Sequence, residues 1–348
     1  TSLGLYELYL NGTRVGDWLF TPGWTSYNKW IQYQTYDITE MLSNGENAVG
    51  IILGNGWYKG NIGWEGNINI YGDKLAALVQ IHITYEDGKE EVVVTDDSWK
   101  ASTGPILMSE IYHGEIYDAR LEKDGWSMKE FDDSEWQGVK VLDKPKDILA
   151  AQVSVPVRKI EEIKPVAVIT TPSGETVLDM GQNMVGWLRF AVEGEAGTVV
   201  TIKHAEVLDK EGNFYTENLR SAKQTIQYTL KGQGREVFEP HFTFQGFRYV
   251  KVEGYPGSLS LDNFTGIVIH SDMEQTGSFK CSDELVNQLQ HNILWGQKGN
   301  FLDVPTDCPQ RDERLGWTGD AQVFIRTACF NMHTASFFTK WLKDLKSD

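Results

Sequence analysis

Residues 303–320 concentrate groups that could take part in catalysis: five carboxylates, two arginines and one tryptophan, together with two prolines and two glycines. The prolines and glycines predict an irregular loop rather than a continuous helix. A charged loop of this kind is often a solvated surface whose internal ion pairs contribute little to stability. Trp317 and the Cys308–Pro309 pair lie among the charges, however, which is unlike a purely solvated face. Several carboxylates on one constrained loop are also expected to raise one another's pKa, as a general acid requires.

Glycoside hydrolysis is the chemistry that this set of groups fits best. It requires a protonated carboxyl group beside the leaving oxygen and a second carboxylate that activates water or acts as nucleophile. Further carboxylates and arginines suit the recognition of hydroxyl groups, and a tryptophan can form an apolar wall. Cys308 is a weaker candidate for a nucleophile, because no histidine lies near it and Pro309 follows it, so a packing role is favoured. The seven histidines and three cysteines show no metal spacing, so we expect no metal site and no cofactor.

The elements that position this loop are expected to be β-strands at first. Alternating runs and the hairpin signals Asn11–Gly12 and Asp87–Gly88 predict β structure over about the first 270 residues. The segment 18–64 is rich in Gly, Trp and Tyr, and its loops could either contact a ligand or pack onto their own sandwich. A boundary is expected near 144–156, followed by a second antiparallel sandwich. Its predicted strands are 166–170, 175–179, 187–192, 199–204, 225–230 and 248–253.

After about residue 276 the apolar spacing becomes helical. The first predicted helix has Ser282 as its N-cap and carries Leu285, Leu289 and Ile293 on one face. A second helical run begins near Gly319, and a third covers 334–345. About seventy residues are too few for an independent helical core, so the apolar faces are expected to pack against the second sandwich or another chain.

Composition limits the class of protein. A chain of 348 residues predicts two or three domains, and its net charge of −17 argues against a broad nucleic-acid surface. No stretch of about 18 uninterrupted apolar residues is present, so no membrane span is expected. Three scattered cysteines are not a disulfide framework, which favours a reducing compartment such as the cytoplasm. The chain begins with Thr1 rather than Met, so it carries no information on a signal peptide and leaves secretion open.

The sixteen residues 307–322, DCPQRDERLGWTGDAQ, resemble the signature of the bacterial α-L-rhamnosidases of glycoside hydrolase family 78. The similarity extends upstream over essentially the whole chain. The segments 6–12, 22–24 and 54–58 resemble the N-terminal β-sandwich of that family, and 179–183 and 244–249 resemble its second sandwich.

The resemblance implies a mostly β chain in which two antiparallel β-sandwich domains precede the first helices of an (α/α)6-barrel catalytic domain. The expected domains are 1–150, with carbohydrate contacts in its loops, 151–275, and an incomplete helical domain at 276–348. The activity implied is inverting hydrolysis of terminal α-L-rhamnosyl residues from glycosides. The family's general base is a glutamate far downstream in the helical barrel, so the resemblance implies that residues 1–348 alone are inactive.

The resemblance also assigns individual residues. Glu313 matches the general acid, and its neighbour Asp312 is the weaker candidate, because adjacent side chains of an extended loop point apart. Asp307, Arg311, Trp317 and Asp320 match residues of the rhamnose subsite, with Asp307 and Asp320 binding hydroxyl groups. Asp303 is expected to orient the loop rather than to bind sugar.

Two other functions remain open from the sequence. The first is a non-catalytic carbohydrate-binding sandwich that uses the aromatic loops of 18–64. The second is another exo-glycosidase with the same helical fold but a different sugar preference. Rhamnose-containing glycosides are the expected partners, nucleic acid and membrane are not, and a homo-oligomer is left open.

Overall fold

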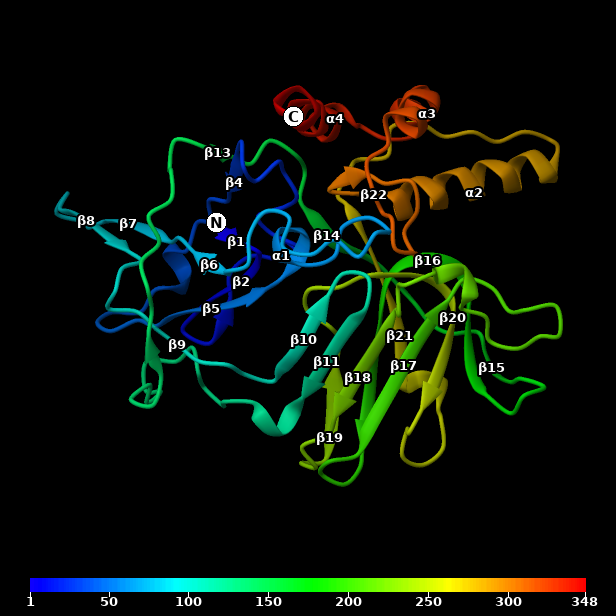
Figure 1. Cartoon of the computed structure of the whole chain (residues 1–348), viewed down its shortest axis with the longest axis horizontal. Helices are drawn as coiled ribbons and strands as arrows, with labels where there is room; N and C mark the ends of the chain where they lie inside the picture. The colour runs from blue at the N-terminus through cyan, green and yellow to red at the C-terminus, as the bar shows by residue number, and fades with distance from the viewer.

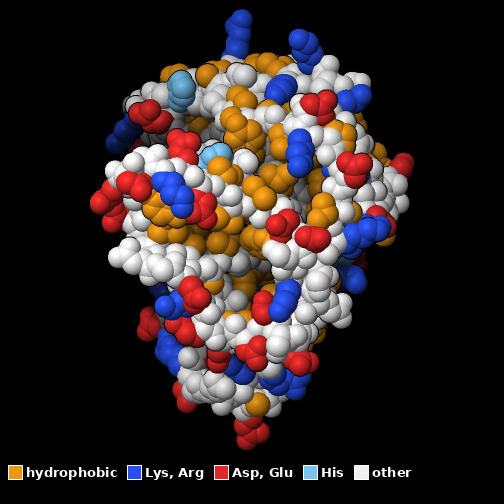
Figure 2. Space-filling model, turned by 90° about the vertical axis from the view of Figure 1, so that its left-hand side faces the viewer, with side chains coloured by type: hydrophobic (Ala, Val, Ile, Leu, Met, Phe, Trp, Pro, Cys, Tyr) orange, Lys and Arg blue, Asp and Glu red, His pale blue; other side chains and the backbone are white.

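The computed structural model describes residues 1–348 and shows a mostly β chain that ends in helices, which confirms the expected fold class. In Figure 1 the N-terminal β region lies on the left and a larger sheet lies at the lower right. The C-terminal helices lie above both. No helix is long and apolar enough to cross a membrane. On the face turned toward the viewer in Figure 2, acidic and basic side chains are interspersed, so no basic field for a polyanion forms there.

The N-terminal region is built from short strands. The hairpin at Asn11–Gly12 is confirmed, because both residues have positive φ and the flanking strands β2 and β3 pair. Asp87–Gly88 likewise joins β7 to β8. The elements are β1 (Ser2–Leu3), β2 (Leu5–Leu10), β3 (Thr13–Arg14), β4 (Ile31–Tyr33), η1 (Thr39–Met41), β5 (Val49–Gly54), α1 (Gly56–Lys59), β6 (Ala76–Ala77), β7 (Gln80–Thr84), β8 (Glu90–Val94), β9 (Lys100–Ala101), β12 (Gln137–Gly138) and β13 (Leu149–Ala151).

A ten-stranded sheet forms the second β region, with the order β10-β11-β18-β17-β20-β16-β21-β14 and with β15 and β19 paired to β16. The runs predicted at 175–179 and 187–192 are halves of one long strand, β16, whose register shifts between Asp179 and Met184. The elements are β10 (Ile106–Glu110), β11 (Gly114–Asp118), η2 (Ala119–Leu121), β14 (Val157–Ile163), β15 (Ala167–Thr170), β16 (Thr176–Glu193), β17 (Val199–Ala205), η3 (Glu217–Leu219), β18 (Thr225–Thr229), β19 (Arg235–Phe238), β20 (Gln245–Glu253), η4 (Leu261–Asn263) and β21 (Phe264–Ser271).

The two β regions share strands and a core. Strands β10 and β11 come from the range expected to form the first sandwich, yet β11 pairs in parallel with β18 of the second. One hydrophobic cluster joins Leu5 and Trp57 of the first region to Trp187 and Ile267 of the second. Phe20, Tyr27, Trp57 and Tyr58 of the 18–64 loops lie in this cluster, so these four side chains have a packing role, whereas Trp64 is exposed.

Three helices follow: α2 (Glu284–Asn300), α3 (Thr318–Asn331) and α4 (Ala335–Ser347), with the short strands β22 (Phe301–Leu302) and β23 (Val304–Pro305) after α2. The predicted N-cap was wrong by one residue, because the side chain of Asp283, not Ser282, accepts from the backbone N–H of Leu285 at 2.9 Å. On α4, Phe337, Phe338 and Trp341 are buried, as expected. On α2 and α3, by contrast, Leu285 and Val323 are each 82% exposed.

A buried ion network fixes α4 to the N-terminal region. Lys340 has no exposed surface, and its ammonium group lies 3.1 Å from Asp303 and 3.4 Å from Asp344. Asp344 also accepts a hydrogen bond from the indole N–H of Trp30 at 2.9 Å. Buried charges persist when they are paired and hydrogen-bonded in this way. The helices and the N-terminal sandwich therefore hold the start of the 303–320 loop between them.

Candidate active site

The loop begins in a strained turn that the N-terminal region supports. Asp303 has φ +66° at the tip of the β22–β23 hairpin, and its carboxylate binds Lys340 and the backbone N–H of Trp24. Its own N–H donates to the hydroxyl of Ser271 at 2.9 Å. All of these contacts are internal to the protein. The position of Asp303 thus agrees with an orienting role.

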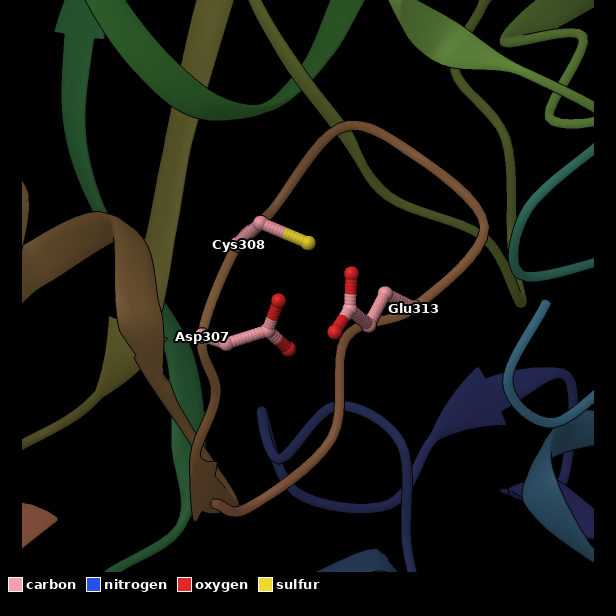
Figure 3. A group of neighbouring side chains, drawn as sticks. All are labelled: Asp307, Cys308 and Glu313. Atoms are coloured by element: carbon pink, nitrogen blue, oxygen red, sulfur yellow. The ribbon is translucent and has the colours of Figure 1, made fainter. Parts of the chain in front are cut away.

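Asp307 closes the loop on itself. Its backbone N–H donates to the carbonyl of Leu315 at 3.0 Å, and its carboxylate accepts from the N–H of Leu315 at 2.9 Å. The nine residues from Asp307 to Leu315 therefore form a closed turn, and the carboxylates of Asp307 and Glu313 extend toward each other across it (Figure 3).

The buried side chain of Arg314 anchors this turn to the two β regions. It is almost fully buried, has φ +50°, and donates to the carbonyl groups of Ile111 at 3.1 Å and Phe244 at 2.7 Å. Two further bonds reach carbonyl groups of the loop itself, at Gln310 and Arg311. Burial lowers the pKa of Arg314, but four hydrogen bonds and two aromatic faces compensate for the missing water.

The segment 244–249 receives the loop on the sheet side. At Gly246, a Cβ atom would lie 3.0 Å from side-chain atoms of Pro309 and Gln310, so glycine permits the close approach of the loop. Nearby, Arg248 and Asp179 form a two-pronged ion pair at 2.8 and 2.9 Å. The motif at 244–249 thus contacts the loop directly, and Arg248 joins it to the motif at 179–183.

The carboxylate of Glu313 accepts hydrogen bonds from three side chains, and the Glu313 side chain is only 14% exposed. Its Oε1 accepts from the indole N–H of Trp317 at 3.1 Å. Its Oε2 accepts from Arg311 Nε and from Arg220, each at 3.0 Å. The structure thus brings Glu313 together with Arg311 and Trp317, as the sequence predicted, and adds Arg220.

The pKa of Glu313 departs from the sequence-based expectation. Burial would raise this pKa, but the hydrogen bonds from Trp317 and Arg220 and the charge of Arg311 outweigh burial and lower it. The expectation that neighbouring carboxylates would raise the pKa of Glu313 was wrong, because the guanidinium groups of Arg311 and Arg220 lie against the carboxylate. These groups favour the ionised form of Glu313.

Asp312 faces a different environment from Glu313. Its carboxylate is buried and accepts from the backbone N–H and the hydroxyl of Ser221, at 3.1 and 2.5 Å. Its other oxygen lies 2.5 Å from Nε of Arg220, an ion pair whose geometry is poor for a hydrogen bond. Asp312 is therefore a structural link to the second β region, and Glu313 is the carboxylate left to face a substrate.

Arg220 is the residue of the site that the sequence did not indicate. It follows η3 in the second β region, has φ +57°, and reaches both Asp312 and Glu313. It lies 93 positions before Glu313, in a segment without any local motif. Only the packing of the loop on the sheet brings the two together.

An open groove of about 540 Å³ lies between α2 and α3. Asp307 and the exposed Asp320 both line it, which brings these two predicted residues to one hollow. Glu313, Arg311 and Trp317 are not part of its lining, although Arg311 and Glu313 lie close to Asp307. The other residues of the groove are Ile293, Gly296, Gln297, Asn300, Phe301, Pro305, Thr306, Gly319, Ala321, Val323 and Phe324.

Asp307, Cys308 and Glu313 are the one group that resembles a metal site, since their ligand atoms lie within 4.8 Å of one another (Figure 3). Arg311 already occupies the space, at 2.9 Å from Glu313 and 3.5 Å from Asp307. Burial also raises the pKa of the Cys308 thiol to about 12, so the thiolate ligand that a metal needs does not form near neutrality. These residues fit neither a cation site nor a cysteine nucleophile.

Three family models match successive parts of the chain. They are described as the α-L-rhamnosidase N-terminal domain at residues 1–161, the bacterial α-L-rhamnosidase concanavalin-like domain at 169–270, and the bacterial α-L-rhamnosidase 6 hairpin glycosidase domain at 274–348. A curated α-L-rhamnosidase of Streptomyces avermitilis is 50% identical over 99% of this chain, and one of Formosa agariphila is 39% identical over 99%. The chain spans 34% and 38% of these relatives, or about a third of their length.

Solved structures agree with the sequence matches. A native α-L-rhamnosidase from Aspergillus terreus superposes with a TM-score of 0.97 at 50% identity, over 99% of this chain and 40% of that one. The Streptomyces avermitilis α-L-rhamnosidase complexed with L-rhamnose gives a TM-score of 0.96 at 49% identity, over 99% and 34%.

Proposed function

The chain belongs to the bacterial α-L-rhamnosidase family, and on that premise we propose that the full-length protein removes terminal α-L-rhamnosyl residues from glycosides with inversion. The observation that carries the proposal is the position of Glu313, which three donors orient beside Asp307 at the edge of the groove. Such a carboxyl group can protonate a glycosidic oxygen while the sugar occupies the groove.

In the proposed mechanism, Asp307 and Asp320 accept hydrogen bonds from sugar hydroxyl groups. Arg311 leaves Glu313 to bind a hydroxyl oxygen, which removes one of the charges that keep Glu313 ionised. The bound sugar also excludes water, and both effects raise the pKa of Glu313 toward that of a general acid. Glu313 then donates its proton to the glycosidic oxygen, whose bond to the anomeric carbon breaks as water attacks that carbon from the opposite face and passes a proton to the general base that the family resemblance places downstream.

The sugar-binding roles can be tested with L-rhamnose as a competitive inhibitor of the full-length protein. We expect Asp320→Ala and Asp307→Asn each to raise the inhibition constant about ten- to a hundredfold, since hydrogen bonds to charged groups contribute roughly 1.5–3 kcal/mol. Asp262→Ala, an exposed position in η4, is the control and should leave the constant unchanged. Unaltered inhibition of both site variants would mean that these carboxylates do not bind the sugar.

The role of Arg220 can be tested through pH dependence. Arg220 lowers the pKa of Glu313, so Arg220→Gln should raise that pKa and keep the acid protonated to higher pH. The alkaline limb of kcat/KM should therefore move to higher pH, because kcat/KM reports the free enzyme. Arg220→Lys, which keeps the charge, should move the limb less.

The control for this experiment is Arg189→Gln. Arg189 pairs with the exposed Glu162 at 2.9 Å, outside the candidate site. An alkaline limb that stays at the wild-type position in a folded Arg220→Gln variant would show that Arg220 does not act on the catalytic acid.

A further inference from the structure

Trp64 of the N-terminal region lies directly against the catalytic loop. Its ring stacks on that of Trp317, with 5.9 Å between centroids and 25° between planes. Trp317 donates its indole N–H to Glu313, so one side chain separates Trp64 from the carboxylate. Trp30 and Trp57 of the 18–64 segment are buried, whereas Trp64 and Trp317 are 46% and 42% exposed. Their contact therefore forms part of the surface beside Glu313.

A hydrogen-bonded link through Tyr112 also fixes the position of Trp64 relative to Glu313. The hydroxyl of Tyr112 donates to the carbonyl of Glu313 at 2.6 Å and accepts from the N–H of Gly63 at 3.0 Å. The residue just before Trp64 is thus tied to the backbone of the acid through a single side chain. Tyr112 is almost fully buried, so this link does not depend on mobile surface groups.

The turn that carries Trp64 is itself constrained. Ile62 pairs with Asn67 across it and is buried in the core shared by the two β regions. Gly63 and Gly66 both have φ near +70°, which turns the chain sharply on either side of Trp64. A large apolar side chain is therefore presented to solvent on a fixed turn, next to the exposed ring of Trp317.

The geometry of glycoside hydrolysis indicates which part of the substrate should lie against Trp64 and Trp317. A general acid protonates the oxygen that joins the sugar to its leaving group, so the leaving group lies beyond the acid as seen from the sugar. Asp307 and Asp320 place the sugar in the groove between α2 and α3, and Trp64 is not among the residues of that groove. The residues around Glu313 that do not line this groove are Trp317 at Oε1, with Trp64 stacked on it, and Arg220 and Arg311 at Oε2.

We propose that Trp64, supplied by the N-terminal sandwich, forms the subsite for the leaving group and selects substrates with a planar apolar aglycone, such as a phenolic ring system. This inference rests on the proposed function. An indole stacks favourably on flat aromatic surfaces, and Ile68 and Ile70 add exposed apolar surface to the same segment. The N-terminal region thus contributes to specificity, while the sugar itself is bound by the loop and the helices.

The test compares Trp64→Ala with the wild type in the full-length protein on two substrates, methyl α-L-rhamnoside and an α-L-rhamnoside of a polycyclic phenol. The ratio of kcat/KM for the phenolic over the methyl substrate should fall about tenfold in the variant, as expected for the loss of one aromatic contact. Trp64→Phe should restore part of the ratio. Tyr85→Ala removes another exposed aromatic side chain of the same region, on the β7–β8 hairpin, and should leave the ratio unchanged.

The outcomes separate this proposal from the proposed function. A wild-type protein without activity on either substrate would overturn the proposed function, and the subsite with it. An active wild type whose Trp64→Ala variant loses activity equally on both substrates would show that Trp64 only supports Trp317. If Trp64→Ala lost activity only on a rhamnose-containing disaccharide and kept it on the phenolic substrate, the subsite would bind a sugar rather than an aromatic aglycone.

Discussion

Replacing Glu313 with Gln in the full-length protein is expected to lower turnover of an alkyl α-L-rhamnoside by about two or more decades, the usual contribution of acid catalysis. Glutamine has nearly the shape of glutamate, and its carbonyl oxygen can still accept from Trp317, but it carries no acidic proton. The measurement is kcat with methyl α-L-rhamnoside, followed by release of L-rhamnose.

The leaving group provides an internal check on this prediction. A nitrophenyl rhamnoside needs little protonation, so Glu313→Gln should reduce its turnover much less than that of the methyl substrate. Glu162→Gln, an exposed glutamate on β14, is the matched control and should affect neither substrate. Near-normal turnover of methyl rhamnoside by Glu313→Gln would exclude Glu313 as the acid, and Asp312 would be the next candidate.

Much of the secondary structure could be predicted because its causes are local. The turn at Asn11–Gly12 and the buried face of α4 each follow from residues within a few positions of one another, and both predictions were confirmed. Strands β10 and β11 were missed; β11 pairs with β18 more than a hundred residues later, and β10 joins the sheet only through β11. An isolated window of sequence contains no sign of that partner.

The candidate site likewise contains residues that the sequence predicted and residues that only the folded chain brings together. The loop itself, with Asp307, Arg311, Glu313 and Trp317, was predicted from one continuous motif, and the structure places these residues together. Arg220, Tyr112 and Trp64 act on Glu313 or Trp317 from distant segments. Trp64 ends the aromatic segment 18–64 that the sequence left open as a ligand contact, whereas no sequence pattern separates Arg220 or Tyr112 from ordinary surface or core residues.

The protonation state of Glu313 could not be deduced from the sequence for a related reason. Counting nearby carboxylates predicts a raised pKa, whereas the pKa depends on which atoms face the group. Asp312 turns to Ser221, while Arg311 and Arg220 turn to Glu313. The two neighbouring residues share Arg220, but only Glu313 also faces Arg311, and the cations rather than the carboxylates determine the direction of its pKa shift.

A polypeptide consisting only of residues 1–348 is expected to release no measurable nitrophenol from an aryl α-L-rhamnoside. Inversion requires a second carboxylate about 6.5–9.5 Å from the acid, with room for a water molecule between them. Asp307 has an oxygen within 4.8 Å of Glu313, which is too close, and it is bonded to the backbone of Leu315. Asp312 is buried against Ser221.

Asp320 is the remaining carboxylate of the groove, and the family resemblance assigns it to hydroxyl binding rather than to water activation. Without a general base, turnover should fall by the roughly two to four decades that such a group supplies. The assay compares purified residues 1–348 with the full-length protein at equal concentration, after circular dichroism has shown that both are folded. Turnover of residues 1–348 near that of the full-length protein would mean that the base is already among them. Loss of that turnover in Asp320→Asn would then identify Asp320 as the base.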